Sequence, residues 1–161
     1  MVNVFKSQNK HIENFTDSTS SIQHTECNKS SDCSEATHIR ITSGTEIAEA
    51  AFKDNKKIIS VEISDSIETI NESAFSGCTN LESVTFGNGI KKIGTLSFSG
   101  CTKLSTLNFP NSLIHIGESA FNNCDKLTSV TIPDRVNHIG PSCFWGCAEL
   151  KTVVKIGRAH V

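Results

Sequence analysis

The chain of 161 residues contains no tyrosine and only one tryptophan. This lack argues against a surface on which nucleic-acid bases stack. The net charge is only −2, so the strong positive field of a nucleic-acid-binding domain is also missing. No apolar run is long enough to span a bilayer, and the opening MVNVFKSQNKHIENF lacks the apolar segment of a secretory signal. We therefore expect no nucleic-acid partner and no membrane insertion by this segment.

Residues 1–37 differ in composition from the rest of the chain. The stretch DSTSSIQHTECNKSSDCSEAT has neither the period of a strand nor that of a helix. Such a polar segment buries too little apolar surface to offset its conformational entropy, so we predict a disordered leader. Cys27 and Cys33 lie in it, and a zinc site would need two more ligands at matching spacing. We interpret both as exposed thiols.

From residue 58 onward the sequence repeats one unit several times without gaps. The complete units are IISVEISDSIETINESAFSGCTN (58–80), LESVTFGNGIKKIGTLSFSGCTK (81–103), LSTLNFPNSLIHIGESAFNNCDK (104–126) and LTSVTIPDRVNHIGPSCFWGCAE (127–149). A degenerate unit that is one residue short in its middle occupies 38–57, and a truncated unit occupies 150–154. One unit is too short to enclose a core, so the units must stack and bury like positions on like. The repeat predicts a β-rich solenoid over 38–154.

Eight positions of the unit carry apolar or small residues in all complete copies. In the third unit they are Leu104, Leu107, Phe109, Leu113, Ile116, Ala120, Phe121 and Cys124. The alternation V-x-I or L-x-F predicts a short strand with one face inward, followed by a turn and a second inward pair. A glycine or asparagine precedes each repeated cysteine, which predicts a left-handed backbone residue there. These residues are Gly77, Gly100, Asn123 and Gly146.

The repeat L-x-x-V-x-I-P-x-x-V-x-x-I-G-x-x-A-F-x-x-C-x-x resembles the BspA-like (treponemal-type) leucine-rich repeats, closely over 58–154 and weakly over 38–57. The resemblance implies a right-handed leucine-rich repeat stack with 23-residue coils. It also implies a noncatalytic protein-binding module of a surface protein, often adhesive toward a host or matrix protein. The implied location is the cell surface or outside the cell, although no signal peptide is visible. An intracellular, cytoplasmic interaction scaffold built from the same repeats is the alternative.

The repeated cysteines Cys78, Cys101, Cys124 and Cys147 lie one unit apart. Stacked units would place their Cα atoms roughly 5 Å apart, which is compatible with disulfide geometry. The column nevertheless belongs to the apolar pattern, and a small thiol packs well when buried. We interpret these cysteines as buried structural thiols, with partial disulfides and a metal site as the alternatives.

No arrangement of residues is typical of a catalytic, cofactor or metal site. The chain has no nucleophile elbow, no phosphate-binding glycine loop and no H-E-x-x-H. His115 and His138 share a position of the repeat, but two ligands are too few for zinc and the position should face solvent. We therefore expect no enzyme activity, no cofactor and no metal ion.

The outward positions of the first predicted strand form a polar face with little charge. Our candidate partner-binding residues are Ser83, Thr85, Thr106, Asn108, Ser129 and Thr131. A solenoid commonly binds along such a continuous face. The alternative interpretation is a soluble sheet surface without a partner.

The last residues, KIGRAHV (155–161), do not continue the repeat. One back-translation of this string resembles a common sequencing-library adapter, so we expect the tail to be non-native.

Overall fold

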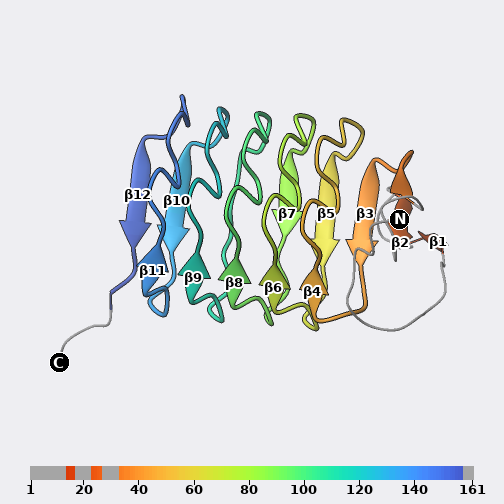
Figure 1. Cartoon of the computed structure of the whole chain (residues 1–161), viewed down its shortest axis with the longest axis horizontal. Coiled ribbons are helices and arrows are strands. Elements are labelled where there is room, and N and C mark those ends of the chain that lie inside the picture. The colour runs from red at the N-terminus through yellow and green to blue at the C-terminus, as the bar shows by residue number, and fades with distance from the viewer. Residues whose placement is uncertain (1–13, 17–22, 27–32, 158–161) are drawn as a thin grey trace.

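The structure is a computed structural model that describes residues 14–16, 23–26 and 33–157. It contains two rows of short strands and, within these residues, no α-helix (Figure 1). The first row comprises β3 (His38–Ile41), β5 (Ser60–Ile63), β7 (Ser83–Thr85), β10 (Ser129–Ile132) and β12 (Thr152–Lys155). The second row comprises β4 (Glu46–Ile47), β6 (Thr69–Ile70), β8 (Lys92–Ile93), β9 (His115–Ile116) and β11 (His138–Ile139). Most coils contribute one strand to each row, and the coils stack side by side along the long axis of the molecule (Figure 1).

Neighbouring coils pair in parallel, in the register that the repeat predicts. Ser60 lies opposite Ser83, which occupies the same position of the next unit. The separation along the chain between His38 and its partner Ser60 is one residue shorter than that between Glu46 and its partner Thr69. The residue missing from the degenerate unit therefore lies between β3 and β4. The predicted β-rich solenoid with 23-residue coils is confirmed.

The interior is filled by the predicted apolar columns. The phenylalanines of successive coils stack face to face, with ring centroids 5.1 to 5.8 Å apart, in the order Phe52, Phe75, Phe98, Phe121 and Phe144. This separation follows from the strand spacing of about 4.8 Å. Phe86 packs its edge against the ring of Phe98 at 5.9 Å, and Phe109 does the same against Phe121 at 5.5 Å. Each inward column thus forms a continuous ladder with no gap between coils.

The segment between the second strand and the cysteine bonds to the next coil through alternate N–H groups. The N–H groups of Ser73, Phe75 and Gly77 donate to carbonyls of the following coil at 2.9, 2.7 and 2.7 Å. Gly77 has φ +72°, so the left-handed residue predicted before the cysteine is confirmed, as it also is in the other three complete units. Ser73 is left-handed too, at φ 55°, and Leu96 repeats this conformation at the same position of the next coil. The N–H groups of every second residue from 73 to 77 thus bond to the following coil.

The repeated corner glycine is required for a different reason. Gly117 does not have a positive φ, but a Cβ added there would lie 2.5 Å from the backbone nitrogen of Thr95 in the preceding coil. A Cβ on Gly94 would likewise lie 2.8 Å from the carbonyl oxygen of Ile70. The repeat therefore keeps glycine at a corner where the backbones of adjacent coils approach each other closely.

The first row is interrupted in the third complete unit. The sheet that contains β3, β5 and β7 ends at β7, and β10 pairs with β12 in a separate sheet. Between them the chain makes one isolated bridge, from Asn108 to Thr131. Asparagine is a poor strand former, and Pro110 has no N–H to donate to a ladder.

Part of the predicted leader belongs to the fold. β1 (Asn14–Thr16) pairs antiparallel with β2 (Gln23–Glu26), and β2 pairs in parallel with β3. Cys33 is fully buried and disulfide-bonded, so its interpretation as an exposed thiol is wrong. Burial against the first coil moves it away from solvent. The other predictions for residues 1–37, including that for Cys27, lie mostly outside the described residues.

Candidate protein-binding face and cysteine ladder

The outward face of the first row presents the six predicted contact residues to solvent. All six side chains are exposed, namely Ser83, Thr85, Thr106, Asn108, Ser129 and Thr131. Between them Val84, Leu107 and Val130 point inward and are almost fully buried. Because successive side chains along each segment point in opposite directions, the polar residues lie on the outer face and the apolar ones in the core. The structure places the six residues together over three successive coils.

These six side chains make no hydrogen bond to any residue that the structure describes. The amino-terminal end of the same face differs. There Arg40 donates to Glu62 at 2.8 Å, and His38 bonds to Ser60 at 2.7 Å. The six polar side chains thus bond to no described residue, whereas the charged side chains of Arg40 and Glu62 bond to each other.

The repeated cysteines are thiols that hydrogen-bond to the backbone of the preceding coil. The Sγ atoms of Cys78, Cys101, Cys124 and Cys147 lie 3.1 to 3.4 Å from the carbonyl oxygens of Phe52, Phe75, Phe98 and Phe121, respectively. Each is a free cysteine, and the first three are fully buried. Among the described residues no group of three or more His, Cys, Asp or Glu side chains could hold a metal ion. The interpretation as structural thiols holds for the first three, while Cys147 is only partly buried.

Burial and neighbouring thiols separate the acidities of these cysteines. Burial raises the pKa of Cys78 to about 12, and it also raises that of Cys101. Interaction between the thiols of Cys124 and Cys147 raises the pKa of Cys124 and lowers that of Cys147 to about 7. Cys147 is therefore the thiol of the ladder that is partly ionised near neutral pH. The repeat of cysteine one unit apart was visible in the sequence, but the difference in pKa between these cysteines was not.

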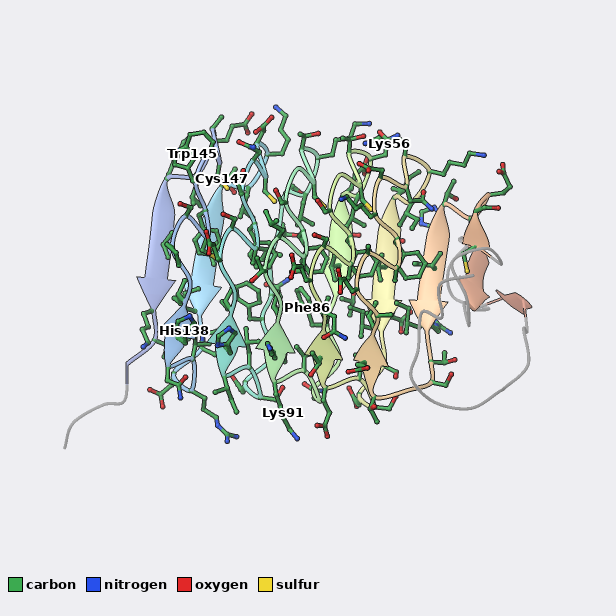
Figure 2. All side chains as sticks on the ribbon, viewed as in Figure 1. Lys56, Phe86, Lys91, His138, Trp145 and Cys147 are labelled. Carbon is green, nitrogen blue, oxygen red and sulfur yellow. The ribbon has the colours of Figure 1, made fainter. Side chains whose placement is uncertain are left out.

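The second row carries the stacked histidines. The rings of His115 and His138 lie 4.4 Å apart with an angle of 7° between them. Burial, the charge of His138 and the charge of Lys92 together lower the pKa of His115. His138 is exposed at the outer surface of β11 (Figure 2), as predicted, and His115 is half-buried.

The profile of the BspA type leucine rich repeat region matches residues 45–157 in six copies. The chain belongs to the BspA-type leucine-rich repeat family. The six copies correspond in number to the four complete units together with the degenerate and the truncated one. No curated protein matches the chain.

Solved structures of other leucine-rich repeat proteins are similar to this BspA-type chain. A leucine rich repeat protein from T. pallidum is 26% identical with a TM-score of 0.74, over 88% of this chain and 67% of that one. A leucine rich cell surface protein from Faecalibacterium prausnitzii is also 26% identical with a TM-score of 0.74, over 87% of this chain and 37% of that one. A leucine-rich repeat protein from Bacteroides ovatus is 25% identical with a TM-score of 0.71, over 93% of this chain and 41% of that one. The chain thus spans less than half the length of the last two.

The BspA-type repeat supports a module suited to protein interaction. Its fold offers an extended face of stacked coils on one side of the core. Within the described part of the chain, no helix is long and apolar enough to cross a membrane.

Proposed function

We propose that this chain is a noncatalytic protein-binding module that contacts its partner through the outward face of β7, the segment 105–109 and β10. The observation that carries the proposal is the row of six exposed polar side chains on this face, none of which bonds to a described residue. These side chains are uncharged, while the flanking pair of Arg40 and Glu62 is charged and already bonded.

Hydroxyl and amide groups suit a protein partner. Serine, threonine and asparagine both donate and accept hydrogen bonds, so they can pair with the backbone and polar side chains of another protein. On the proposed face the first and third coils present the same pair of residue types, Ser83 with Thr85 and Ser129 with Thr131, whereas the middle coil presents Thr106 and Asn108. The amide of Asn108 therefore gives the middle coil a contact that its neighbours lack.

The proposed partner is a protein on a host cell or in the extracellular matrix, and the proposed location is the cell surface. Support comes from the F. prausnitzii relative, which is described as a cell surface protein. The alternative is an intracellular scaffold. Antibody labelling of intact and permeabilised cells distinguishes them, because a surface module is labelled in both and a scaffold only after permeabilisation.

The binding face can be tested with matched charge variants. The double variant Thr85→Lys/Thr131→Lys places two cations on the proposed face. Its control, Ser66→Lys/Asn137→Lys, adds the same charge at exposed positions outside the first row. The purified chain and both variants are titrated against immobilised collagen, laminin and fibronectin and against intact epithelial cells. We expect saturable binding that the first variant weakens at least tenfold and the control leaves unchanged. Absence of saturable binding to every surface, or equal loss in both variants, contradicts the proposal.

A further inference from the structure

The four repeated cysteines are not equally accessible. Cys78, Cys101 and Cys124 are fully buried, whereas Cys147 is only partly buried. Figure 2 shows Cys147 at the loop end of its coil, at the same end of the molecule as the exposed Trp145. A small oxidant dissolved in water therefore meets Cys147 before any other member of the ladder.

The nearest thiol to Cys147 is held at a distance that allows a disulfide. The N–H of Asn123 donates to the carbonyl of Trp145 at 2.8 Å, immediately before the two cysteines. The backbones that carry Cys124 and Cys147 are thus one coil spacing apart, about 4.8 Å, and disulfides join Cα atoms about 4.4–6.8 Å apart. Both thiols donate to backbone carbonyls of the preceding coil, Cys124 to Phe98 at 3.4 Å and Cys147 to Phe121 at 3.2 Å, so the two side chains follow the same path one coil apart.

We propose that Cys147 is a peroxide-reactive thiol and that Cys124 resolves its oxidised form into a disulfide between the third and fourth complete units. The sulfur of ionised Cys147 attacks one oxygen of hydrogen peroxide, the O–O bond breaks, and the departing oxygen takes up a proton and leaves as water. Cys147 is then a sulfenic acid. The Cys124 sulfur attacks the Cys147 sulfur, the S–O bond breaks, and hydroxide leaves with the Cys124 proton as a second water. The two thiols together lose two electrons, which reduce the peroxide.

The electrostatic surroundings favour Cys147 as the thiol that attacks peroxide and Cys124 as the thiol that resolves the sulfenic acid. Interaction with the thiol of Cys124 lowers the pKa of Cys147 to about 7, which favours the nucleophilic thiolate at this position. The same contact, with burial, raises the pKa of Cys124, which keeps its proton. A thiol has one proton, so Cys124 can turn it from the carbonyl of Phe98, 3.4 Å away, to the ionised sulfur of Cys147.

The other cysteines are less suited to either role. Cys78 and Cys101 have the same spacing, but both are fully buried and burial raises the pKa of each. Cys143 occupies the alanine position of the repeat, is 5% exposed, and has its pKa raised to about 12 by burial. It therefore serves as the control for resolution by a different neighbour.

Peptide mapping of the full chain tests the proposal. Trypsin cleaves after Lys103, Lys126, Arg135 and Lys151, so Cys124 lies in peptide 104–126, while Cys143 and Cys147 share peptide 136–151. After limited hydrogen peroxide, alkylation and digestion without reductant, we expect the two peptides joined by a disulfide. The Cys143→Ser variant should retain this product, and Cys124→Ser and Cys147→Ser should each lose it. In Cys124→Ser, dimedone should label residue 147 as a trapped sulfenic acid.

Two results overturn the proposal. One is a disulfide confined to peptide 136–151, because it makes Cys143 the resolving thiol. The other is oxidation of Cys101 at the same rate as Cys147 in chain whose circular dichroism is native, because accessibility would then not select the site. Comparing circular dichroism of all variants before oxidation ensures that a lost product reflects lost chemistry and not a lost fold.

Discussion

Ser97 is a polar residue in the buried core of the solenoid. It occupies the column that holds Ala74 and Ala120 in the neighbouring coils, and its side chain is fully buried. Its Oγ has no hydrogen-bond partner among the described residues. We predict that Ser97→Ala stabilises the protein, because alanine already fits this column one coil away on either side.

The size of the expected gain in stability follows from the free-energy cost of burying the Ser97 hydroxyl away from water. A buried hydroxyl without a partner costs about 1–3 kcal/mol, and the small gap left by one oxygen atom offsets part of the gain. We expect Ser97→Ala to raise the free energy of unfolding by about 1 kcal/mol. The matched variant Ala120→Ser introduces the same group in the next coil and should lower it by about as much.

The assay is guanidinium unfolding followed by circular dichroism, with the midpoint and slope fitted for each variant. A change of midpoint at constant slope reports a change of stability. If Ser97→Ala lowered the midpoint, the hydroxyl would have to make a favourable bond in the native state, and the reasoning from its isolation would be refuted. A neutral Ala120→Ser would refute the stated cost of the buried hydroxyl in this column.

Three further predictions concern the ladder and the coil contacts. Phe98→Ala removes a fully buried ring from the middle of the stack and should cost about 3–5 kcal/mol in the same unfolding assay, whereas a loss below about 1 kcal/mol would mean that the ladder is not continuous. Gly117→Ala forces a Cβ against the backbone of the preceding coil and should cost about 1–3 kcal/mol; an unchanged thermal midpoint would contradict this close approach. Burial and the neighbouring His138 lower the pKa of His115, so the folded state binds this proton more weakly than the unfolded state. The contribution of neutral His115 to stability is present above pH 6.5 and is lost as the pH falls through the lowered pKa. The variant His115→Thr, which copies Thr69, should therefore flatten the decline of the melting temperature at acid pH.

The period of the repeat was sufficient to predict the register and the inward columns. A gapless repeat has only one way to stack like on like, so pairing Ser60 with Ser83 needs no further information. The left-handed residue at Gly77 was also predictable, because glycine at a fixed position marks a conformation that other residues avoid. The exposed face followed from the alternation along β7.

Other features of the structure could not be predicted from the neighbouring residues in the sequence. Ser73 and Leu96 have positive φ because the neighbouring coil accepts their N–H groups, although neither residue type favours this conformation. The burial of Cys33 depends on where the chain passes over the first coil. The interruption of the first row at Asn108 was not predicted, and only the pairing with Thr131 shows that one bridge remains there.

The sequence by itself determined which residues form ladders, because a gapless repeat fixes which side chains meet from coil to coil. Only the tertiary structure decided how members of one ladder differ. Cys101 and Cys147 occupy the same position of the repeat, yet one is fully buried and the other is partly buried with a pKa of about 7. The shared repeat pattern gives the same backbone geometry at both positions, whereas acidity and accessibility depend on the place of each coil in the stack and on the charges and thiols around it.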